Sequence, residues 1–320
     1  MSSTLSEFDL IKTFFEGVGP ASTDVKMGIG DDCAVVDIPG DQSLCLSLDT
    51  MVAGVHFLHD APPKKIAYRA LAAALSDLAA MGATPSHFTL SLTLPYSNSE
   101  WLSEFSLGLK LLADLFQIPL VGGDTTKGPL TIGLQVHGLV PKGKALKRSG
   151  AQVGDVIVVT GTLGDAGGAL ALLLDKEWQC CEETTDEQLF LLDRYYSPSP
   201  RIEQGIELRA LASACIDISD GLLADAAHIA NKSSVQLEFD SMKLPLSAAL
   251  LSENRLNSRQ FALSSGDDYE LLFTISKANW KALNKVSNIY TEIGLVKKGS
   301  GVVVKSMSEK VVNTGYQHFE

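Results

Sequence analysis

The stretch Ser43-Leu44-Cys45-Leu46-Ser47-Leu48-Asp49-Thr50 alternates polar and apolar residues and carries an aspartate near its end. Alternation with a period of two predicts a β-strand, with the three leucines on one face and the serines, the cysteine and the aspartate on the other. Ser47 and Asp49 therefore share a face, roughly 7 Å apart along the strand. A strand that delivers a hydroxyl and a carboxylate side by side is a candidate for a ligand site.

Aspartates recur along the chain in similar short motifs flanked by glycine or serine. The motifs are Gly30-Asp31-Asp32, Ser47-Leu48-Asp49-Thr50, Ser76-Asp77, Gly122-Gly123-Asp124-Thr125, Asp217-Ile218-Ser219-Asp220-Gly221 and Gly266-Asp267-Asp268. Singly, each could be an ordinary turn or cap: Asp220 could start a helix at Gly221, and Asp31 could close the turn after Gly30. Together they indicate oxygen ligands for hard cations, beside glycines that let the backbone approach phosphate. The pattern therefore predicts a magnesium site that serves a phosphorylated ligand.

Strands and helices alternate irregularly around these motifs, which favours the α+β class. An alanine-rich helix is predicted over residues 64–81, with Asp77 on a face of small residues. The other predicted elements are strands over 43–49, 130–140, 155–160 and 215–219 and helices over 169–174 and 221–231. Basic residues interrupt the apolar pattern at 141–154, so we expect two domains, at residues 1–148 and 149–320.

Composition narrows the class of protein. The chain has 320 residues and 45% hydrophobic content, enough for a substantial core and two domains. A formal net charge of −12 without a Lys/Arg run argues against nucleic-acid binding, so anionic ligands would need bridging cations. The five cysteines, with Cys180 next to Cys181, form no Cys-x-x-Cys pair that would indicate a zinc site. No apolar run approaches the ~18 residues of a membrane span, and residues 1–10 lack a signal-peptide core, so we expect a cytoplasmic protein without membrane contact.

Other nucleotide-binding patterns are absent or incomplete. Residues 138–145 are a near match to a Walker A loop, but Ala145 lacks the hydroxyl that would ligate magnesium. A glycine turn at 161–168 lies between a strand and a helix, as a phosphate cradle would, but it lacks G-x-G-x-x-G spacing, which favours a structural turn. Protein-kinase signatures and an EF-hand loop are missing. On residue type alone, His56 would be a surface or half-buried histidine and Arg148 an exposed base.

A longer set of motifs runs in order along nearly the whole chain. Its members are Gly28-Ile29-Gly30-Asp31-Asp32, Ser47-Leu48-Asp49-Thr50, Gly54-Val55-His56-Phe57, Leu75-Ser76-Asp77-Leu78-Ala79-Ala80-Met81-Gly82, Gly122-Gly123-Asp124-Thr125-Thr126, Arg148-Ser149-Gly150, Thr160-Gly161-Thr162-Leu163-Gly164, Asp217-Ile218-Ser219-Asp220-Gly221 and Gly266-Asp267-Asp268-Tyr269-Glu270-Leu271. This set closely resembles the thiamine-monophosphate kinase family. That family is similar in fold to aminoimidazole ribonucleotide synthetase and selenophosphate synthetase. The resemblance implies a two-domain α+β fold and a homodimer, in which strands of the N-terminal domains, the ATP- and magnesium-binding ones, form a shared β-barrel.

The resemblance also implies roles for individual residues. The family's magnesium-binding positions are matched by Asp31, Asp32, Ser47, Asp49, Thr50, Asp77, Asp124, Asp217 and Asp220. Positions that hold ATP are matched by Gly123, Asp124, Arg148 and Ser219, and positions that contact thiamine monophosphate by His56 and Asp267. The chain departs from the family twice. Asp267 stands where the family has a glutamate, and Asn313 replaces a C-terminal aromatic that stacks on substrate, so that Tyr316 becomes the candidate to compensate.

The implied reaction is magnesium-dependent transfer of the γ-phosphoryl group of ATP to thiamine monophosphate, which gives thiamine diphosphate for its biosynthetic pathway. The acceptor oxygen is already ionised at neutral pH, so the chemistry is expected to be metal-centred, no general base is expected, and no catalytic side chain is assigned. Two alternatives stay open. One is a sibling synthetase acting on a purine precursor or on selenide, although no reactive cysteine in a glycine-rich stretch precedes Gly28. The other is a non-catalytic binding protein with the same fold.

Overall fold

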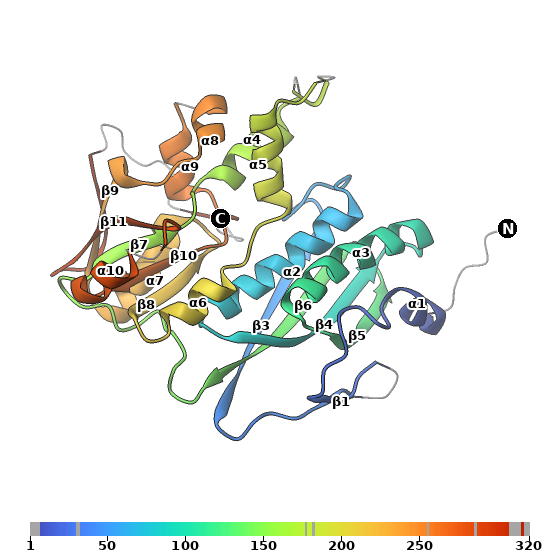
Figure 1. Cartoon of the computed structure of the whole chain (residues 1–320). Coiled ribbons are helices and arrows are strands. Elements are labelled where there is room, and N and C mark those ends of the chain that lie inside the picture. The colour runs from blue at the N-terminus through green and yellow to red at the C-terminus, as the bar shows by residue number, and fades with distance from the viewer. Residues whose placement is uncertain are drawn as a thin grey trace. The chain divides into compact units, whose positions relative to one another are not determined.

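The computed structural model (Figure 1) describes residues 7–29, 33–176, 178–180, 183–254, 256–284, 287–306 and 315–316. The chain divides into two compact units. The N-terminal unit comprises residues 1–78 and 83–143, and the C-terminal unit comprises residues 79–82 and 144–320. Each unit combines one main sheet with helices, as expected for mixed α and β content. Within these ranges, no helix is both long and apolar enough to cross a bilayer.

The N-terminal unit is built on a four-stranded sheet of order β3-β6-β4-β5. Its strands are β3 (Gln42–Val52), β6 (Thr131–Pro141), β4 (Thr84–Leu94) and β5 (Leu120–Lys127), and its helices are α1 (Glu7–Phe14), α2 (Pro63–Ala80) and α3 (Ser99–Phe116). Only the β4–β5 pair is parallel within this sheet. A separate two-stranded sheet joins β1 (Val25–Met27) to β2 (Val35–Val36).

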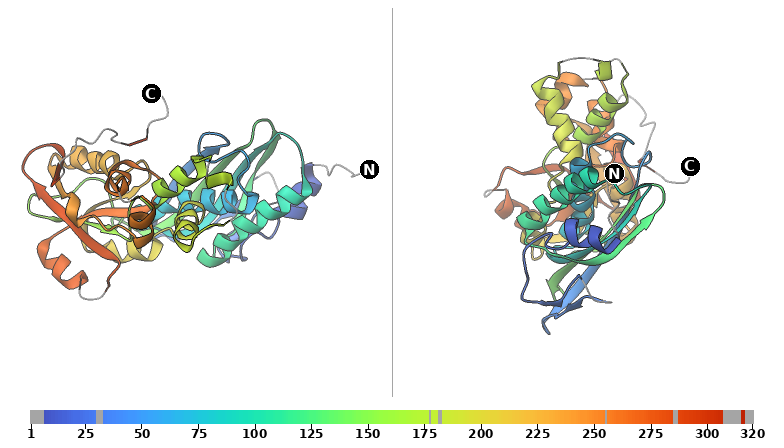
Figure 2. Two further views of the ribbon diagram at one scale, coloured as in Figure 1. Left: turned by 90° about the horizontal axis from the view of Figure 1, so that it is seen from above. Right: turned by 90° about the vertical axis from the view of Figure 1, so that its right-hand side faces the viewer.

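Helices α2 and α3 lie side by side against one face of this sheet (Figures 1 and 2). Their close approach depends on glycine, because a Cβ at Gly108 of α3 would collide with the Lys64 carbonyl of α2. The helix side of the sheet is apolar: Phe88, Leu92 and Val136 are fully buried. The alanines of α2 keep the helix close to the sheet, which brings polar side chains at its C-terminal end near the strands.

The opposite face of β3 is exposed. Leu46 and Leu48 are 57% and 63% exposed, and Leu44 is 37% exposed. The predicted alternation of this strand is therefore confirmed, but it is Ser47 and Asp49 that point toward α2 and the leucines that point away. An exposed row of three leucines on an edge strand is unusual for a monomer.

The C-terminal unit contains a six-stranded sheet of order β12-β9-β11-β7-β10-β8. Its strands are β7 (Val156–Thr160), β8 (Ala212–Ile218), β9 (Gln236–Asp240), β10 (Glu270–Ile275), β11 (Tyr290–Lys297) and β12 (Gly301–Lys305). All neighbours are antiparallel except β12 and β9. The α-helices are α4 (Asp165–Leu174), α5 (Asp186–Tyr196), α6 (Ile202–Leu208), α7 (Leu222–Ser233), α8 (Ala248–Glu253), α9 (Ser258–Ser264) and α10 (Lys277–Leu283). Alternate residues of β7, β8 and β10 pack with α7 and α9 into one apolar core.

The predicted elements agree with this structure except at the start of α4. The helix begins at Asp165, four residues before the predicted start at 169, so the last glycines of the turn are helical. Side chains there would collide with neighbours: a Cβ at Gly168 would lie 2.7 Å from Leu250 Cδ1. These glycines serve close packing of α4, which the sequence pattern alone does not distinguish from a turn.

Candidate functional site

Three of the predicted metal-binding residues of the N-terminal unit, Ser47, Asp49 and Asp77, meet where β3 passes the C-terminal half of α2. The Ser47 hydroxyl donates a hydrogen bond to Asp77 Oδ2. Asp49 lies two residues further along β3 on the same face, close enough to Asp77 for that charge to affect its pKa. Burial, followed by the charge of Asp77, raises the pKa of Asp49 to about 7. Two carboxylates held together against their mutual repulsion, with a hydroxyl beside them, form a donor set that suits a hard dication.

Thr50 and Asp124 do not join this group within the chain. Thr50 follows Asp49 on β3 and therefore lies on the other face of the sheet. Asp124 is on β5, and strands β6 and β4 lie between β5 and β3. Register pairing runs from Thr50 through Gly133 and Ser91 to Asp124, so these four residues form a row across the sheet.

Gly123 is a position where only glycine fits. Its φ is +154°, and a Cβ there would collide with the Leu90 carbonyl oxygen of β4. Asp124, next to it, is exposed. Because β5 approaches β4 closely at Gly123, the Gly123 backbone and the Asp124 carboxylate lie together at the open edge of the sheet.

Asp31 and Asp32 lie outside the described residues, as does Asn313. Among the residues that are described, no three or more His, Cys, Asp or Glu side chains gather as a metal-binding group. The Ser47–Asp49–Asp77 group has two carboxylates and a hydroxyl, so it can supply part of a coordination shell.

His56 is held in one orientation by the backbone. Its Nδ1 accepts a hydrogen bond from the Val52 N–H at 3.0 Å, and Arg69 reaches its carbonyl oxygen at 3.5 Å. Because Nδ1 is an acceptor, the neutral imidazole carries its hydrogen on Nε2. The half-buried His56 can therefore donate from Nε2 to an anionic or carbonyl group.

The predicted residues of the C-terminal unit gather at the end of β8. Asp217 is 4% exposed on this strand. The N–H groups of Ser219 and Asp220 both donate to Asp225 Oδ2, at 3.0 and 3.1 Å. Burial, followed by the charge of Asp220, raises the pKa of Asp225 to about 7. Asp225 was not a predicted site residue, yet it fixes the turn that presents Ser219 and Asp220.

Arg148 lies near the same turn. Its charge favours the ionised form of Asp225, and its carbonyl accepts a hydrogen bond from Ser233 Oγ at 3.4 Å. The preceding Lys147 carbonyl accepts the Cys215 N–H at 2.8 Å, so this segment runs along β8. The exposed guanidinium is thus placed beside the acidic turn.

Asp267 and Tyr316 also reach this turn through backbone contacts. The Asp267 N–H donates to the Ser219 carbonyl at 2.9 Å, and the Tyr316 N–H donates to the Asp220 carbonyl at 3.0 Å. A Cβ at Gly266 would collide with the Ser219 carbonyl oxygen, so glycine permits this approach. The structure therefore brings Asp267 and Tyr316 together with Ser219 and Asp220.

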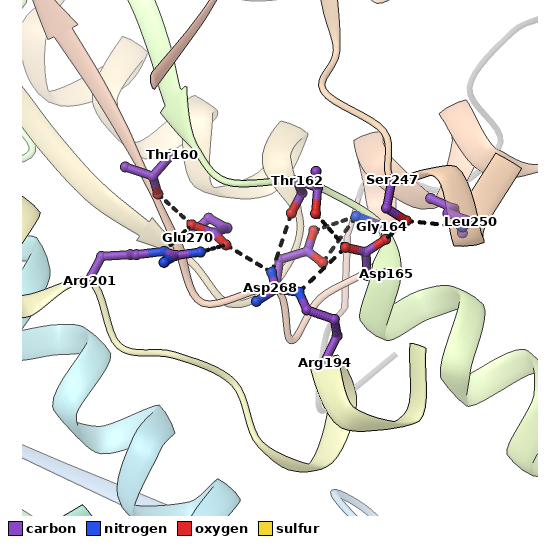
Figure 3. Close-up of polar contacts among 10 residues, drawn as sticks. All are labelled: Thr160, Thr162, Gly164, Asp165, Arg194, Arg201, Ser247, Leu250, Asp268 and Glu270. Carbon is purple, nitrogen blue, oxygen red and sulfur yellow. Dashed lines mark hydrogen bonds and ion pairs between the residues drawn. The ribbon is translucent and has the colours of Figure 1, made fainter. Parts of the chain in front are cut away.

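A buried ionic network surrounds Asp268 and Glu270, which follow Asp267 in the chain (Figure 3), and sequence reasoning missed it. Glu270 is fully buried, and Arg201 binds it through two hydrogen bonds of 2.6 Å while Arg194 adds one of 2.8 Å. Asp268 accepts the Gly164 N–H at 2.8 Å. This bond uses a backbone N–H that a phosphate cradle at the glycine turn would need, which agrees with a structural role for Gly164. The sequence did offer one signal: in the Gly266-Asp267-Asp268-Tyr269-Glu270 motif, the acids Asp268 and Glu270 alternate with Asp267 and Tyr269.

Comparisons with known proteins cover both units. Residues 30–140 match the family described as AIR synthase related protein, N-terminal domain, and residues 152–306 match AIR synthase related protein, C-terminal domain. These two matches confirm the predicted two-domain fold. The chain is 45% identical over 321 residues to the thiamine-monophosphate kinase of Salmonella typhimurium, a match that covers 98% of each chain.

Two solved structures are similar over most of their length. The crystal structure of thiamine-monophosphate kinase from Stenotrophomonas maltophilia K279a superimposes with a TM-score of 0.85 at 41% identity, covering 90% of this chain and 93% of that one. AaThiL complexed with AMPPCP and TMP superimposes with a TM-score of 0.80 at 34% identity, covering 99% and 100%. The similarity thus extends from the acidic group of the N-terminal unit to the Asp267 turn.

Proposed function

This chain belongs to the thiamine-monophosphate kinase family, and from that premise we propose that it transfers the γ-phosphoryl group of ATP to the phosphate of thiamine monophosphate. The observation that carries the proposal is the similarity, over 99% of this chain, to AaThiL complexed with AMPPCP and TMP. The products are thiamine diphosphate and ADP. The reaction therefore belongs to thiamine diphosphate biosynthesis, in the cytoplasm.

The acidic groups of the site are proposed to hold magnesium. The Ser47–Asp49–Asp77 group supports this, because the carboxylates of Asp49 and Asp77 repel one another unless a cation lies between them. The complete proposed set is Asp31, Asp32, Ser47, Asp49, Thr50, Asp77, Asp124, Asp217 and Asp220. Bound magnesium ions would offset the negative charge of the phosphates as they approach each other.

Other residues are proposed to bind the two substrates directly. Gly123, Asp124, Arg148 and Ser219 would hold ATP, with the exposed guanidinium of Arg148 pairing with a phosphate. His56, Asp267 and Tyr316 would contact thiamine monophosphate. The donor on His56 Nε2 suits the acceptor phosphate, because that phosphate offers only acceptor oxygens at neutral pH.

The chemistry that these residues support is direct in-line transfer. The attacking phosphate oxygen is ionised, so the protein needs to align and neutralise the two anions and does not need to remove a proton. No histidine–carboxylate pair is required. A phosphorylated enzyme detected in rapid-quench experiments would contradict this mechanism.

The proposed assembly is a homodimer in which the two four-stranded sheets share a β-barrel. The open edges β3 and β5, and the exposed leucines of β3, support this proposal. Residues 1–148 would then form the ATP- and magnesium-binding domain that also dimerises, and residues 149–320 the second α+β domain.

The test is an ADP-release assay with ATP and magnesium, in which thiamine monophosphate, thiamine and no acceptor are compared and the product is identified by chromatography. We expect ADP and thiamine diphosphate in equal amounts with thiamine monophosphate only. ATP binding without any acceptor-dependent ADP release would refute the kinase and favour a binding protein or a sibling synthetase. Omission of magnesium, with EDTA present, should abolish turnover.

A further inference from the structure

The turn that carries Asp267 is held in an unfavourable backbone conformation. Asp267 has a φ of +70° and Tyr269 a φ of +50°, both in the left-handed region. For a bulky aromatic residue this region is a genuine outlier, which persists only where the surrounding structure enforces it. The Tyr269 side chain is 7% exposed, and its hydroxyl donates to Asp267 Oδ1 at 3.0 Å.

The neighbours of Tyr269 in the chain provide that enforcement. Asp268 and Glu270 flank it and are 2% and 0% exposed. Both oxygens of Asp268 accept the Gly164 N–H, at 3.0 and 2.8 Å. Glu270 accepts from Arg201, Arg194 and the Thr160 hydroxyl, the last at 2.6 Å (Figure 3). Both flanking side chains are thus anchored, and the Tyr269 N–H also donates to the Ile218 carbonyl at 2.8 Å, so the backbone at Tyr269 is held from both sides.

The network itself is tied to several elements. Arg194 comes from α5 and also contacts Asp165 Oδ2 at 3.4 Å, and Arg201 precedes α6. Asp165, at the start of α4, accepts a further hydrogen bond from Ser247 Oγ at 2.6 Å. Burial raises the pKa of Asp268 well above its ordinary value. A buried network of hydrogen-bonded ionisable groups that joins several elements is costly to rearrange, because any group left without its partner would pay a desolvation penalty.

We propose that Tyr269 is a positioning residue that orients the Asp267 carboxylate for thiamine monophosphate, and that the Arg194–Arg201–Glu270 network keeps Tyr269 in place. The proposal rests on the proposed function, because Asp267 is the residue proposed to contact that substrate. The buried network would then affect substrate binding through the Tyr269 hydroxyl, in addition to its contribution to stability.

The first test is Tyr269→Phe, which removes the hydroxyl and keeps the ring. We expect the KM for thiamine monophosphate to rise about five- to tenfold, in the range of one hydrogen bond to a charged group, while the KM for ATP stays within about twofold. The matched control is Tyr290→Phe. Tyr290 lies on β11 of the same sheet, and its hydroxyl donates to Glu207 of α6 at 2.5 Å. That variant should leave both KM values unchanged.

The second test follows the network. Arg201→Lys keeps the charge but loses the two-pronged hydrogen bond to Glu270, and it should also raise the KM for thiamine monophosphate. In the double variant with Tyr269→Phe, the two increases should combine to less than their product, because both act through the same hydroxyl. If the two substitutions only damaged the structure, their increases in KM would multiply independently and would appear for both substrates.

The outcomes are separable. If the wild-type chain makes no thiamine diphosphate, the proposed function fails. If the wild-type chain is active but Tyr269→Phe leaves the KM for thiamine monophosphate unchanged, or raises both KM values equally, the positioning role alone is overturned.

Discussion

His87 and His137 form a stacked pair on neighbouring strands β4 and β6. Their ring centroids are 4.3 Å apart with the planes inclined by 13°, and Ser86 Oγ lies 3.0 Å from His87 Nδ1. Burial, followed by the charge of His137, lowers the pKa of His87 to about 4. Burial also lowers the pKa of His137. Both shifts mean that protonation of either ring is disfavoured in the folded protein.

This pair should make the fold sensitive to acid. Between the ordinary histidine pKa and the lowered one, the unfolded chain binds more protons than the folded chain, so stability is lost as the pH falls from about 6.5 to about 4. At about 1.4 kcal/mol per pKa unit, His87 alone would account for roughly 3 kcal/mol. In thermal melts at about pH 7.5 and about pH 4.5, the Tm of His87→Gln should fall less between the two pH values than the Tm of the wild type. Exposed His59→Gln should behave like the wild type, and equal acid sensitivity of His87→Gln would contradict the assignment.

At the scale of elements, the N-terminus of α4 shows how one glycine serves a buried network. Gly164 has a φ of +85°, and a Cβ there would lie 2.6 Å from the Ala262 backbone nitrogen. Its N–H is also the donor to Asp268. Glycine is therefore required at this junction of α4, α9 and the Asp268 turn for two reasons, the positive φ and the lack of space for a Cβ.

Gly164→Ala should destabilise the protein severely. Left-handed strain costs about 1–2 kcal/mol, and the collision with backbone adds to it against a total stability of only about 5–15 kcal/mol. Gly154→Ala is the control, since Gly154 has a φ of +100° but open space where the Cβ would be. Urea denaturation should show a small loss for Gly154→Ala and a loss larger by several kcal/mol for Gly164→Ala. Equal losses would mean that the contact with Ala262 is relieved by local movement.

Local patterns predicted these elements well and the contacts between distant ones poorly. The alternation in residues 43–49 predicted β3 and its two faces, but not that the leucines would face outward, because exposure depends on what covers the sheet. The resemblance named Asp267 and Ser219 as candidate site residues, but it did not predict the hydrogen bond between their backbones. Arg194 and Arg201 gave no local signal, because they meet Glu270 from 76 and 69 residues away.

At the scale of the whole molecule, the exposed leucines of β3 bear on assembly. A row of apolar side chains on an open sheet edge favours association with a second copy, since burying it removes apolar surface from water. The opposite face of the same strand carries Ser47 and Asp49. Any change that separates two copies at this edge would therefore disturb a strand that is also proposed to bind magnesium.

We therefore expect Leu46→Lys to convert a dimer into a monomer and to lower activity along with it. Leu46 is 57% exposed, so a lysine there causes no clash within one chain but would place a charge in the proposed barrel. Leu111→Lys on α3 is the control, because Leu111 is 50% exposed on the helix side and should leave the dimer intact. Light scattering coupled to size-exclusion chromatography gives the mass of each variant. A wild-type monomer, or a Leu46→Lys variant that stays dimeric, would show that the leucines of β3 are not the contact.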